Sequence, residues 1–243
     1  MPYSHPQALT REQALGRISH LLPGALAFAG TAGFINSVAL AVFNSPVSHM
    51  TGALSYLGIE AAAGHGGPAL GTCSVILAFM AGAATAGLVI GAYDLAPGRR
   101  YGAAILGESA LLFFAMALLL HGRHSGVLLI ALACGRQNAA TSSYCGLMIR
   151  TTHVTGTVTD LGVMLGHWLR HRHVERRKLA LMLGLVLAFG TGVLLGAAAN
   201  ARSGPACLLL PASGCLIAGA AIAVFPGWFT RSLPPPVGRP RAA

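Results

Sequence analysis

The chain has 243 residues, of which 54% are hydrophobic and only 9% are charged, and its mean hydropathy is +0.67. Soluble domains usually carry about a quarter charged residues, so this composition excludes an ordinary soluble globular protein and indicates an integral membrane protein. The formal net charge of +10 would suit a nucleic-acid-binding protein, but the basic residues follow a membrane topology, which argues against nucleic acid as a partner.

The apolar residues come in six segments of roughly 20 residues, the length that a helix needs to cross a hydrocarbon core of ~30 Å. In chain order these segments are 21–43, 72–93, 101–120, 126–148, 179–200 and 206–227. Glycine and alanine crowd all six, as is usual where membrane helices approach each other closely. The sequence therefore predicts an all-α integral membrane protein with six transmembrane helices over residues 21–227. A cytoplasmic N-terminal tail (1–20) and a Pro-rich cytoplasmic tail (228–243) flank this domain and are expected to be disordered.

The Lys and Arg residues are distributed unevenly between the two sides of the membrane. With the N-terminus in the cytoplasm, 13 of the 16 fall on the cytoplasmic side, Arg123 and Arg202 fall outside, and Arg136 lies within the membrane. Segment 44–71, on the outer side, has no Lys or Arg. Because cytoplasmic loops carry the excess of basic residues, we expect both termini in the cytoplasm.

The second half of the chain repeats three stretches of the first half in the same order. The pairs are GFIN (33–36) and GRQN (135–138), SHMTGALSYLG (48–58) and THVTGTVTDLG (152–162), and AFMAG (78–82) and AFGTG (188–192), at offsets of 102, 104 and 110 residues. Each copy, about 21–120 and about 126–227, holds three spans. Since a unit with an odd number of spans must insert upside down the second time, the sequence predicts two inverted three-helix repeats. This architecture recurs in transporters, which tend to bind substrate at the repeat interface.

Four stretches of the sequence carry a family resemblance. GFINSVAL, SPVSHMTG, RQNAATSSY and especially RTTHVTGTVTDLG resemble the YoaK-like family of bacterial six-span inner-membrane proteins, over about residues 20–227. The resemblance implies a multi-pass protein of the bacterial inner (plasma) membrane, of unassigned function, for which small-molecule transport is one description. The chain departs from the family pattern at Ala53, where asparagine is usual, and at Arg136, where an apolar residue is usual.

Two His-x-Thr-Gly motifs are the first candidate site. The first contains His49 and Thr51; the second contains His153 and Thr155, and Asp160 shares a helical face with His153. Two interpretations stay open. In the structural one, polar groups and glycines satisfy the backbone at a helix break beside the membrane. In the functional one, the motifs are half-sites for a solute, and the histidines bind it or take up protons.

Four polar residues lie inside predicted spans. Asn36 and Asn138 occupy equivalent positions and form interhelical hydrogen bonds worth ~0.6–2 kcal/mol, or line the solute path. Arg136 falls near the bilayer midplane, where a charge costs ~2.5–3.5 kcal/mol, so we expect it to face the protein interior or a water-filled cavity and to have a partner. Glu108 lies at a similar depth, so a Glu108–Arg136 ion pair is the leading expectation. An Arg136 that binds an anionic substrate is the alternative.

No sequence motif of a catalytic site is present, and we expect no enzymatic activity, no cofactor and no metal. The five cysteines form no CxxC pair and fit small core residues. His167 and His171 have the spacing of two metal ligands, but no Cys or carboxylate cluster completes a site. Because basic residues surround them, a segment that is attracted to anionic lipid headgroups is favoured.

These features predict a permease-like transporter for a small anionic or zwitterionic solute. The expected lining is Asn36, His49, Thr51, Arg136, Asn138, His153, Thr155 and Asp160. Protonation of a histidine or a carboxylate would be a natural coupling step. A major-facilitator carrier needs twelve spans, so a six-span chain is expected to act as a homodimer. The alternative function is a non-transporting scaffold or sensor whose polar motifs are structural; an enzyme acting on membrane lipid is disfavoured, because no nucleophile and base cluster together.

Overall fold

A computed structural model describes residues 11–43, 46–90, 98–142, 152–172 and 174–226 of the chain. Every regular element in these ranges is helical, which confirms the all-helical prediction for them. In chain order the helices are α1 (Arg11–Phe43), α2 (Met50–Ala62), α3 (Gly66–Ile90), α4 (Arg99–Leu120), α5 (Gly126–Ser142), α6 (Val154–His171), α7 (Arg176–Ser203), the 3-10 helix η2 (Gly204–Leu208) and α8 (Leu209–Val224). Helix α1 begins at Arg11, inside the segment expected to be a tail. Most of the remaining tail residues lie outside the described ranges.

Four helical segments of the described residues are long and apolar enough to cross a membrane. They are Leu22–Phe43, Gly66–Ile90, Arg99–Leu120 and Arg176–Val224. The last is 49 residues long and contains α7, η2 and α8. Helix α5 has 17 residues, and the end of the predicted span 126–148 lies outside the described residues. The six predicted spans are thus matched in part, by four apolar segments.

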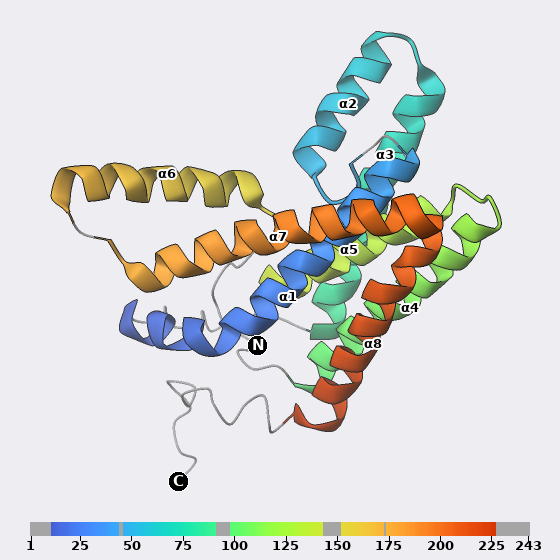
Figure 1. The fold of residues 1–243 in the computed structure, drawn as a ribbon. Helices are drawn as coiled ribbons and strands as arrows, with labels where there is room; N and C mark the ends of the chain where they lie inside the picture. Colours follow the sequence, from blue (N-terminus) through green and yellow to red (C-terminus); the bar gives the residue numbers. More distant parts are fainter. Residues whose placement is uncertain (1–10, 44–45, 91–97, 143–151, 173, 227–243) are drawn as a thin grey trace, which may run out of the picture.

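The long segment Arg176–Val224 bends where α7 ends. Gly204 follows Ser203 with a φ of +56°, in the left-handed region that favours glycine. Pro205 comes next and has no backbone N–H to continue the α-helical hydrogen bonds. Figure 1 shows α7 and α8 running in different directions on either side of this bend.

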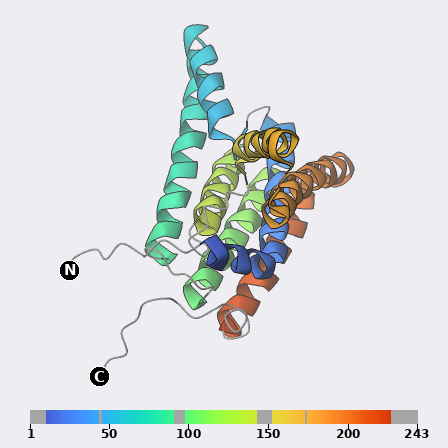
Figure 2. The ribbon, with the colours of Figure 1, turned by 90° about the vertical axis from the view of Figure 1, so that its left-hand side faces the viewer.

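Helices pack in three main pairs: α1 with α7, α3 with α5, and α4 with α8. Figures 1 and 2 show these pairs gathered in one bundle, with helices α2 and α6 outside it. The largest fully buried apolar side chains come from α1, α4, α5 and η2: Ile35, Ile105, Leu112, Ile130 and Leu208. The core therefore joins the first and second halves of the chain.

Glycines allow the backbones of two of these pairs to touch. A Cβ atom at Gly33 in α1 would collide with the carbonyl of Phe189 in α7, and one at Gly135 in α5 would collide with that of Phe79 in α3. Gly33 corresponds to Gly135 at the repeat offset of 102 residues, and Phe79 corresponds to Phe189 at the offset of 110 residues, so these two contacts are equivalent. The same offsets relate the close approach of Gly192 to Gly30 with that of Gly82 to Leu132. Both halves thus use matching contacts.

The α4–α8 contact is symmetric, because its two close approaches correspond to each other. A Cβ atom at Gly102 would lie 2.7 Å from the backbone nitrogen of Ala223, and one at Gly219 would lie 2.9 Å from that of Leu106. Gly102 corresponds to Gly219, and Leu106 to Ala223, at a common offset of 117 residues. This close approach joins the last spans of the two predicted repeats.

The helices that follow the His-x-Thr-Gly motifs project from the bundle. Helix α2 packs against α3, and α6 packs against α7. Figure 1 shows the α2–α3 hairpin at the top of the view and the α6–α7 hairpin at the left. The two hairpins occupy equivalent places in the two halves of the sequence.

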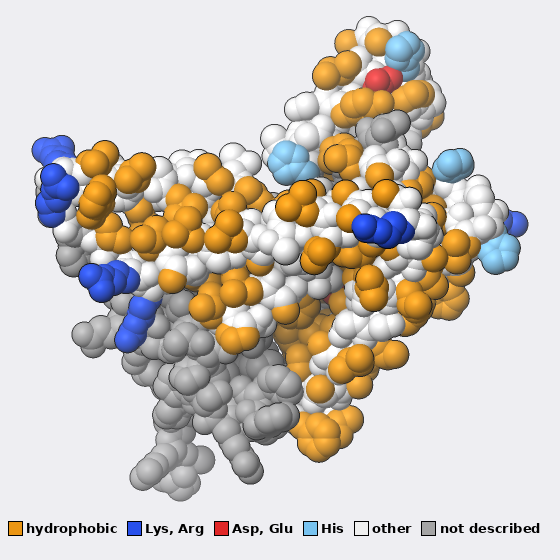
Figure 3. Space-filling model, viewed as in Figure 1, with side chains coloured by type: hydrophobic (Ala, Val, Ile, Leu, Met, Phe, Trp, Pro, Cys, Tyr) orange, Lys and Arg blue, Asp and Glu red, His pale blue; other side chains and the backbone are white. Residues whose placement is uncertain are grey.

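Large apolar side chains cover the outside of the bundle. Leu88 is 84% exposed, Leu194 73% and Ile217 70%. Figure 3 shows such side chains spread over α6, α7 and α8. Contiguous apolar surface of this kind is rare on soluble monomers and fits contact with lipid. Together with the four apolar helical segments, it indicates a membrane protein.

Candidate functional site

The two His-x-Thr-Gly motifs line one cavity of about 390 Å³. Its lining contains matching residues of both motifs together with side chains of α3 and α5: Ser48, His49, Met50, Thr51, Phe79, Asn138, Thr152, His153 and Thr155. Motifs that are about a hundred residues apart in the chain therefore meet in space. The cavity lies within the size range of about 300–1,000 Å³ that is usual for small-molecule sites.

The first motif is fixed to α1 by a hydrogen bond. The Ser48 hydroxyl donates to Asn36 Oδ1 at 2.7 Å. His49 is the N-cap residue of α2, and its carbonyl accepts the backbone N–H of Ala53 at 3.1 Å. The His49 ring folds back over the helix. A Cβ atom at Gly52 would lie only 2.8 Å from His49 Nδ1. Glycine in the motif thus provides space for the imidazole.

The second motif repeats this arrangement on α5. The Thr152 hydroxyl donates to Asn138 Oδ1 at 3.1 Å. His153 is the N-cap residue of α6, and its carbonyl accepts the N–H of Thr157 at 3.1 Å. A Cβ atom at Gly156 would collide with the His153 ring. The hydrogen bond to asparagine, the N-cap histidine and the close approach of glycine to its ring each recur here, so the geometry of these contacts, like the sequence, is duplicated.

Several hydroxyl groups near the motifs bond within their own helices. Ser55 donates to the carbonyl of Thr51 at 3.0 Å, and Thr159 donates to that of Thr155 at 2.9 Å. Thr157 donates to the carbonyl of His153 at 3.0 Å. These bonds explain part of the threonine content of the second motif as helix-internal bonding.

The cavity lining combines apolar surface with several hydrogen-bonding groups and few ionisable ones. Among the described residues that line it, the two imidazoles are the only ionisable groups. Hydroxyls, one amide and two imidazoles can both donate and accept hydrogen bonds. Phe79 adds an apolar wall. This set can hold a small polar molecule by hydrogen bonds.

The structure brings five of the eight sequence-predicted site residues to this cavity: His49, Thr51, Asn138, His153 and Thr155. Asn36 lies behind the lining, as the acceptor for Ser48. Asp160 is exposed on α6, and Arg136 lies apart from the lining.

Arg136 faces α3 and α4. Its guanidinium donates to Thr85 Oγ1 at 2.9 Å and to the carbonyl of Ala104 at 3.2 Å. Glu108 is close enough to interact with it electrostatically. Among the described residues, no direct ion pair between Glu108 and Arg136 is found. Glu108 Oε1 and Arg136 Nε are buried there without a hydrogen-bond partner. The geometry thus shows an interaction at longer range than the ion pair expected from the sequence.

A cluster on α2 lies outside the membrane-spanning segments. His65 Nδ1 contacts Glu60 Oε2 at 2.8 Å. The Glu60 carboxylate also raises the pKa of Tyr56, because a tyrosinate beside it would add a second negative charge. No group of three or more His, Cys, Asp or Glu side chains that could hold a metal ion is found in the described part of the chain.

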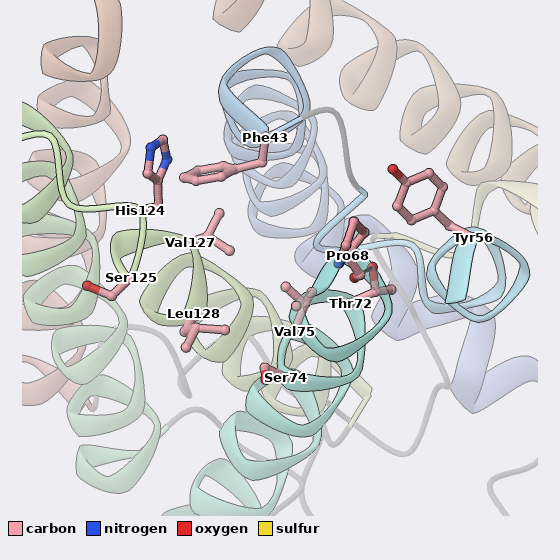
Figure 4. A pocket seen from close by; sticks show the side chains of 11 residues that line it. Phe43, Tyr56, Pro68, Thr72, Ser74, Val75, His124, Ser125, Val127 and Leu128 are labelled. Carbon is pink, nitrogen blue, oxygen red and sulfur yellow. Dashed lines mark hydrogen bonds between the residues drawn. The ribbon is translucent and has the colours of Figure 1, made fainter. Parts of the chain in front are cut away.

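Sequence reasoning missed four lining residues, Ser48, Met50, Phe79 and Thr152, and a second cavity. Ser48 and Thr152 could have been found as the repeated first position of the motif, and Phe79 from the repeated stretch AFMAG. The second cavity, of about 540 Å³, lies where the ends of α1, α3 and α5 meet. Figure 4 shows its lining, with the Phe43 ring directed toward His124 and with Val75 and Thr72 on α3. The Phe43 and His124 rings make an edge-on contact, with their centroids 5.8 Å apart.

The comparisons with known proteins give a family. Residues 24–221 of the 243 match the family described as "Protein of unknown function (DUF1275)". No curated protein and no solved structure matches the chain. The resemblance to YoaK-like proteins is consistent with this family. Since the match covers most of the chain, the protein belongs to the DUF1275 family.

Proposed function

We propose that this protein crosses the membrane six times as two inverted three-helix repeats. The spans are α1, α3 and α4 in the first repeat and α5, α7 and α8 in the second. The support is that three sets of backbone contacts recur at the repeat offsets, so that α1–α7 corresponds to α5–α3 and α4–α8 corresponds to itself. Such correspondence is what a two-fold relation between the repeats produces. The excess of basic residues on one side favours cytoplasmic termini.

Within this architecture the protein acts as a permease for a small solute. The observation that carries the proposal is the cavity lined by both His-x-Thr-Gly motifs. Inverted-repeat transporters tend to place their solute sites at the interface between repeats. A binding role rather than a catalytic one fits a lining of hydroxyl, amide and imidazole groups. By analogy with carriers that have twice as many spans, the working unit is a homodimer.

The lining favours a small polar solute that is neutral or zwitterionic. Its polar side chains are hydrogen-bonding groups, and Arg136, for which binding of an anionic substrate is the alternative expectation, lies elsewhere. A solute with hydroxyl, carbonyl or amino groups could exchange its hydrogen bonds with water for bonds to these side chains. The Phe79 ring would pack against an apolar part of the solute.

The second cavity is suited to be the outer vestibule of the site. Thr72 and Val75 line it, and Phe79, on the same face of α3, lines the site itself. In the proposed topology the α2–α3 turn and the start of α5 are extracellular, so this cavity (Figure 4) is nearer the outer surface. A solute from outside would pass the Phe43 and His124 rings before reaching the two motifs.

The duplicated hydrogen bonds indicate how the site could open. Ser48 ties the first motif to α1, and Thr152 ties the second to α5. Each motif would therefore move with the first helix of its own repeat. Rocking of one repeat against the other would separate the motifs on one side of the membrane at a time, as alternating access requires.

A ligand-stabilisation screen tests the proposed function. The purified protein in detergent is melted against pools of small polar metabolites at two pH values. A solute at 100 times its dissociation constant stabilises the native state by ~2.7 kcal/mol. We expect hits that His153→Gln and His49→Gln abolish. Asp160→Asn, which changes an exposed group outside the lining, should keep them.

The alternative function is a scaffold or sensor, and one observation favours it. The Asn36 and Asn138 side chains accept bonds from the motifs themselves, as a lock on a helix break would require. In that case no pool stabilises the protein, and the histidine variants are less stable without any ligand. Hits that survive both histidine variants would place the solute outside this cavity.

A further inference from the structure

Apart from the solute cavity, the bundle contains a buried carboxyl group, that of Glu108, on the side of α5 that faces α4. Glu108 of α4 is 2% exposed and lies in one of the apolar membrane-spanning segments. One of its oxygens, Oε1, has no hydrogen-bond partner. The Cys215 thiol of α8 lies near the carboxyl group. A buried carboxylate with so few partners is costly, whereas a neutral carboxyl group is far less so.

The nearest cation is held away from this carboxyl. The Arg136 guanidinium is bonded to Thr85 and to the Ala104 carbonyl, and it lies in the space that a Cβ atom at Gly107 would fill. Its Nε is buried without a partner. The Glu108 and Arg136 side chains thus both have spare hydrogen-bonding capacity, although they are close enough to interact electrostatically.

The fold does not require this cluster. At the repeat offsets, Arg136 corresponds to Phe34, Thr85 to Leu195, and Glu108 to Phe225. The equivalent residues in the other half are therefore apolar, while the backbone contacts of Gly135, Gly82 and Gly102 recur at Gly33, Gly192 and Gly219. A polar cluster that only one half contains is not explained by the packing that both halves share.

We propose that Glu108 is a proton-binding site, which holds a proton in the arrangement seen here and releases it to water when the Arg136 guanidinium turns to pair with the carboxylate. The O–H bond breaks, the proton leaves, and the remaining negative charge is balanced by the guanidinium. Among the described residues, the other ionisable groups that interact with Glu108 are Cys134 on α5 and Cys215 on α8. On α3 the nearby polar group is the Thr85 hydroxyl, and no ionisable side chain of α3 or η2 interacts with Glu108 among the described contacts.

The cluster and the solute cavity share helix α5. Arg136 points to one side of this helix, and Asn138 lines the cavity on another. A turn of α5 that brought Arg136 to Glu108 would also displace Asn138. On the proposed function, this proton would be the coupling ion of the permease; the proton site itself does not depend on it.

Infrared spectroscopy tests the site directly, because the chain has only six Asp and Glu residues. Spectra are recorded in maltoside micelles, whose detergent has no carboxyl or ester group, over a series of pH values. We expect a protonated-carboxyl absorption near neutral pH that Glu108→Gln removes and Asp160→Asn keeps. Arg136→Met should keep the band to higher pH, because the cation that favours the carboxylate is gone.

Three results would overturn the proposal. They are no such band in the wild type at neutral pH, a band of equal size in Glu108→Gln, and an unchanged pH course in folded Arg136→Met. If Glu108→Gln does not fold, Glu108→Asp retains a carboxyl and should shift the band; an unshifted band would then reject the site. Failure of the metabolite screen leaves these spectra unaffected, so the two proposals fail separately.

Discussion

Alanine substitutions at four glycines test the helix contacts that relate the two halves. Gly82 on α3 and Gly192 on α7 correspond at the repeat offset and lie against the backbones of Leu132 and Gly30. Gly87 on α3 and Gly190 on α7 have nothing within 4 Å of the position that a Cβ atom would take. Each helix thus contains one glycine at a contact and one facing outward as its matched control.

The geometry sets the size of the effect. A Cβ atom at Gly82 or at Gly192 would lie 2.8 Å from a carbonyl carbon of the neighbouring helix, and carbon atoms prefer about 3.5–4.0 Å. The rigid backbone must therefore move by roughly 1 Å, which loses packing along the helix pair. Overpacking of this kind costs about 1–3 kcal/mol. At Gly87 and Gly190, alanine meets open space and should change stability little, or raise it by up to ~1 kcal/mol through reduced backbone freedom.

Unfolding of the purified variants in mixed micelles with increasing denaturing detergent measures these free energies. We expect Gly82→Ala and Gly192→Ala to lose similar amounts, and Gly87→Ala and Gly190→Ala to lose none. Equal stability of Gly82→Ala and Gly87→Ala would refute the close contact between α3 and α5. A large loss at only one of Gly82 and Gly192 would refute the equivalence of the two helix pairs.

Three further predictions follow from the motifs and from α2. Ser48→Ala and Thr152→Val should each cost about 0.5–1.5 kcal/mol in the same unfolding assay, because each removes a hydrogen bond to an asparagine oxygen; a neutral result for both would contradict a stabilising role of these two hydrogen bonds. Gly156→Ala should displace the His153 ring and abolish solute stabilisation, while Gly162→Ala, which meets open space, should keep it; equal effects would remove His153 from the site. Glu60→Gln should lower the pKa of Tyr56, measured as tyrosinate absorbance against a Tyr56→Phe blank, because ionisation no longer creates a second negative charge there; an unchanged titration would show that Glu60 does not act on Tyr56.

Much of the helical framework could be predicted from the sequence, because apolar length and repetition are local signals. The spans 101–120 and 72–93 are close to the observed α4 and α3, and the His-x-Thr-Gly motifs do begin helices α2 and α6. The duplication, together with the analogy to inverted-repeat transporters, predicts that His49 and His153 line one cavity. This prediction needs no knowledge of how each helix is rotated, since both histidines are the N-cap residues at the starts of their helices.

What could not be predicted depends on helix rotation. Glu108 and Arg136 were placed at one depth by counting residues, but depth does not say which side of α5 the guanidinium takes. Gly107 decides this, because its missing side chain leaves space against α4. Asp160 shares a face with His153 on α6, yet that helix leaves the cavity along α7, so the carboxylate is exposed. These outcomes follow from contacts between distant segments.

The opposite insertion of the two repeats can be measured by labelling cysteines from one side of the membrane. His65, before α3, and Glu175, before α7, correspond at the repeat offset of 110 residues. His65→Cys and Glu175→Cys are each treated in whole cells with a membrane-impermeant maleimide, and the wild type provides the background. We expect His65→Cys to react from outside and Glu175→Cys to react only after the membrane is opened. Labelling of both from the same side would contradict the inverted repeats and, with them, a solute site at their interface.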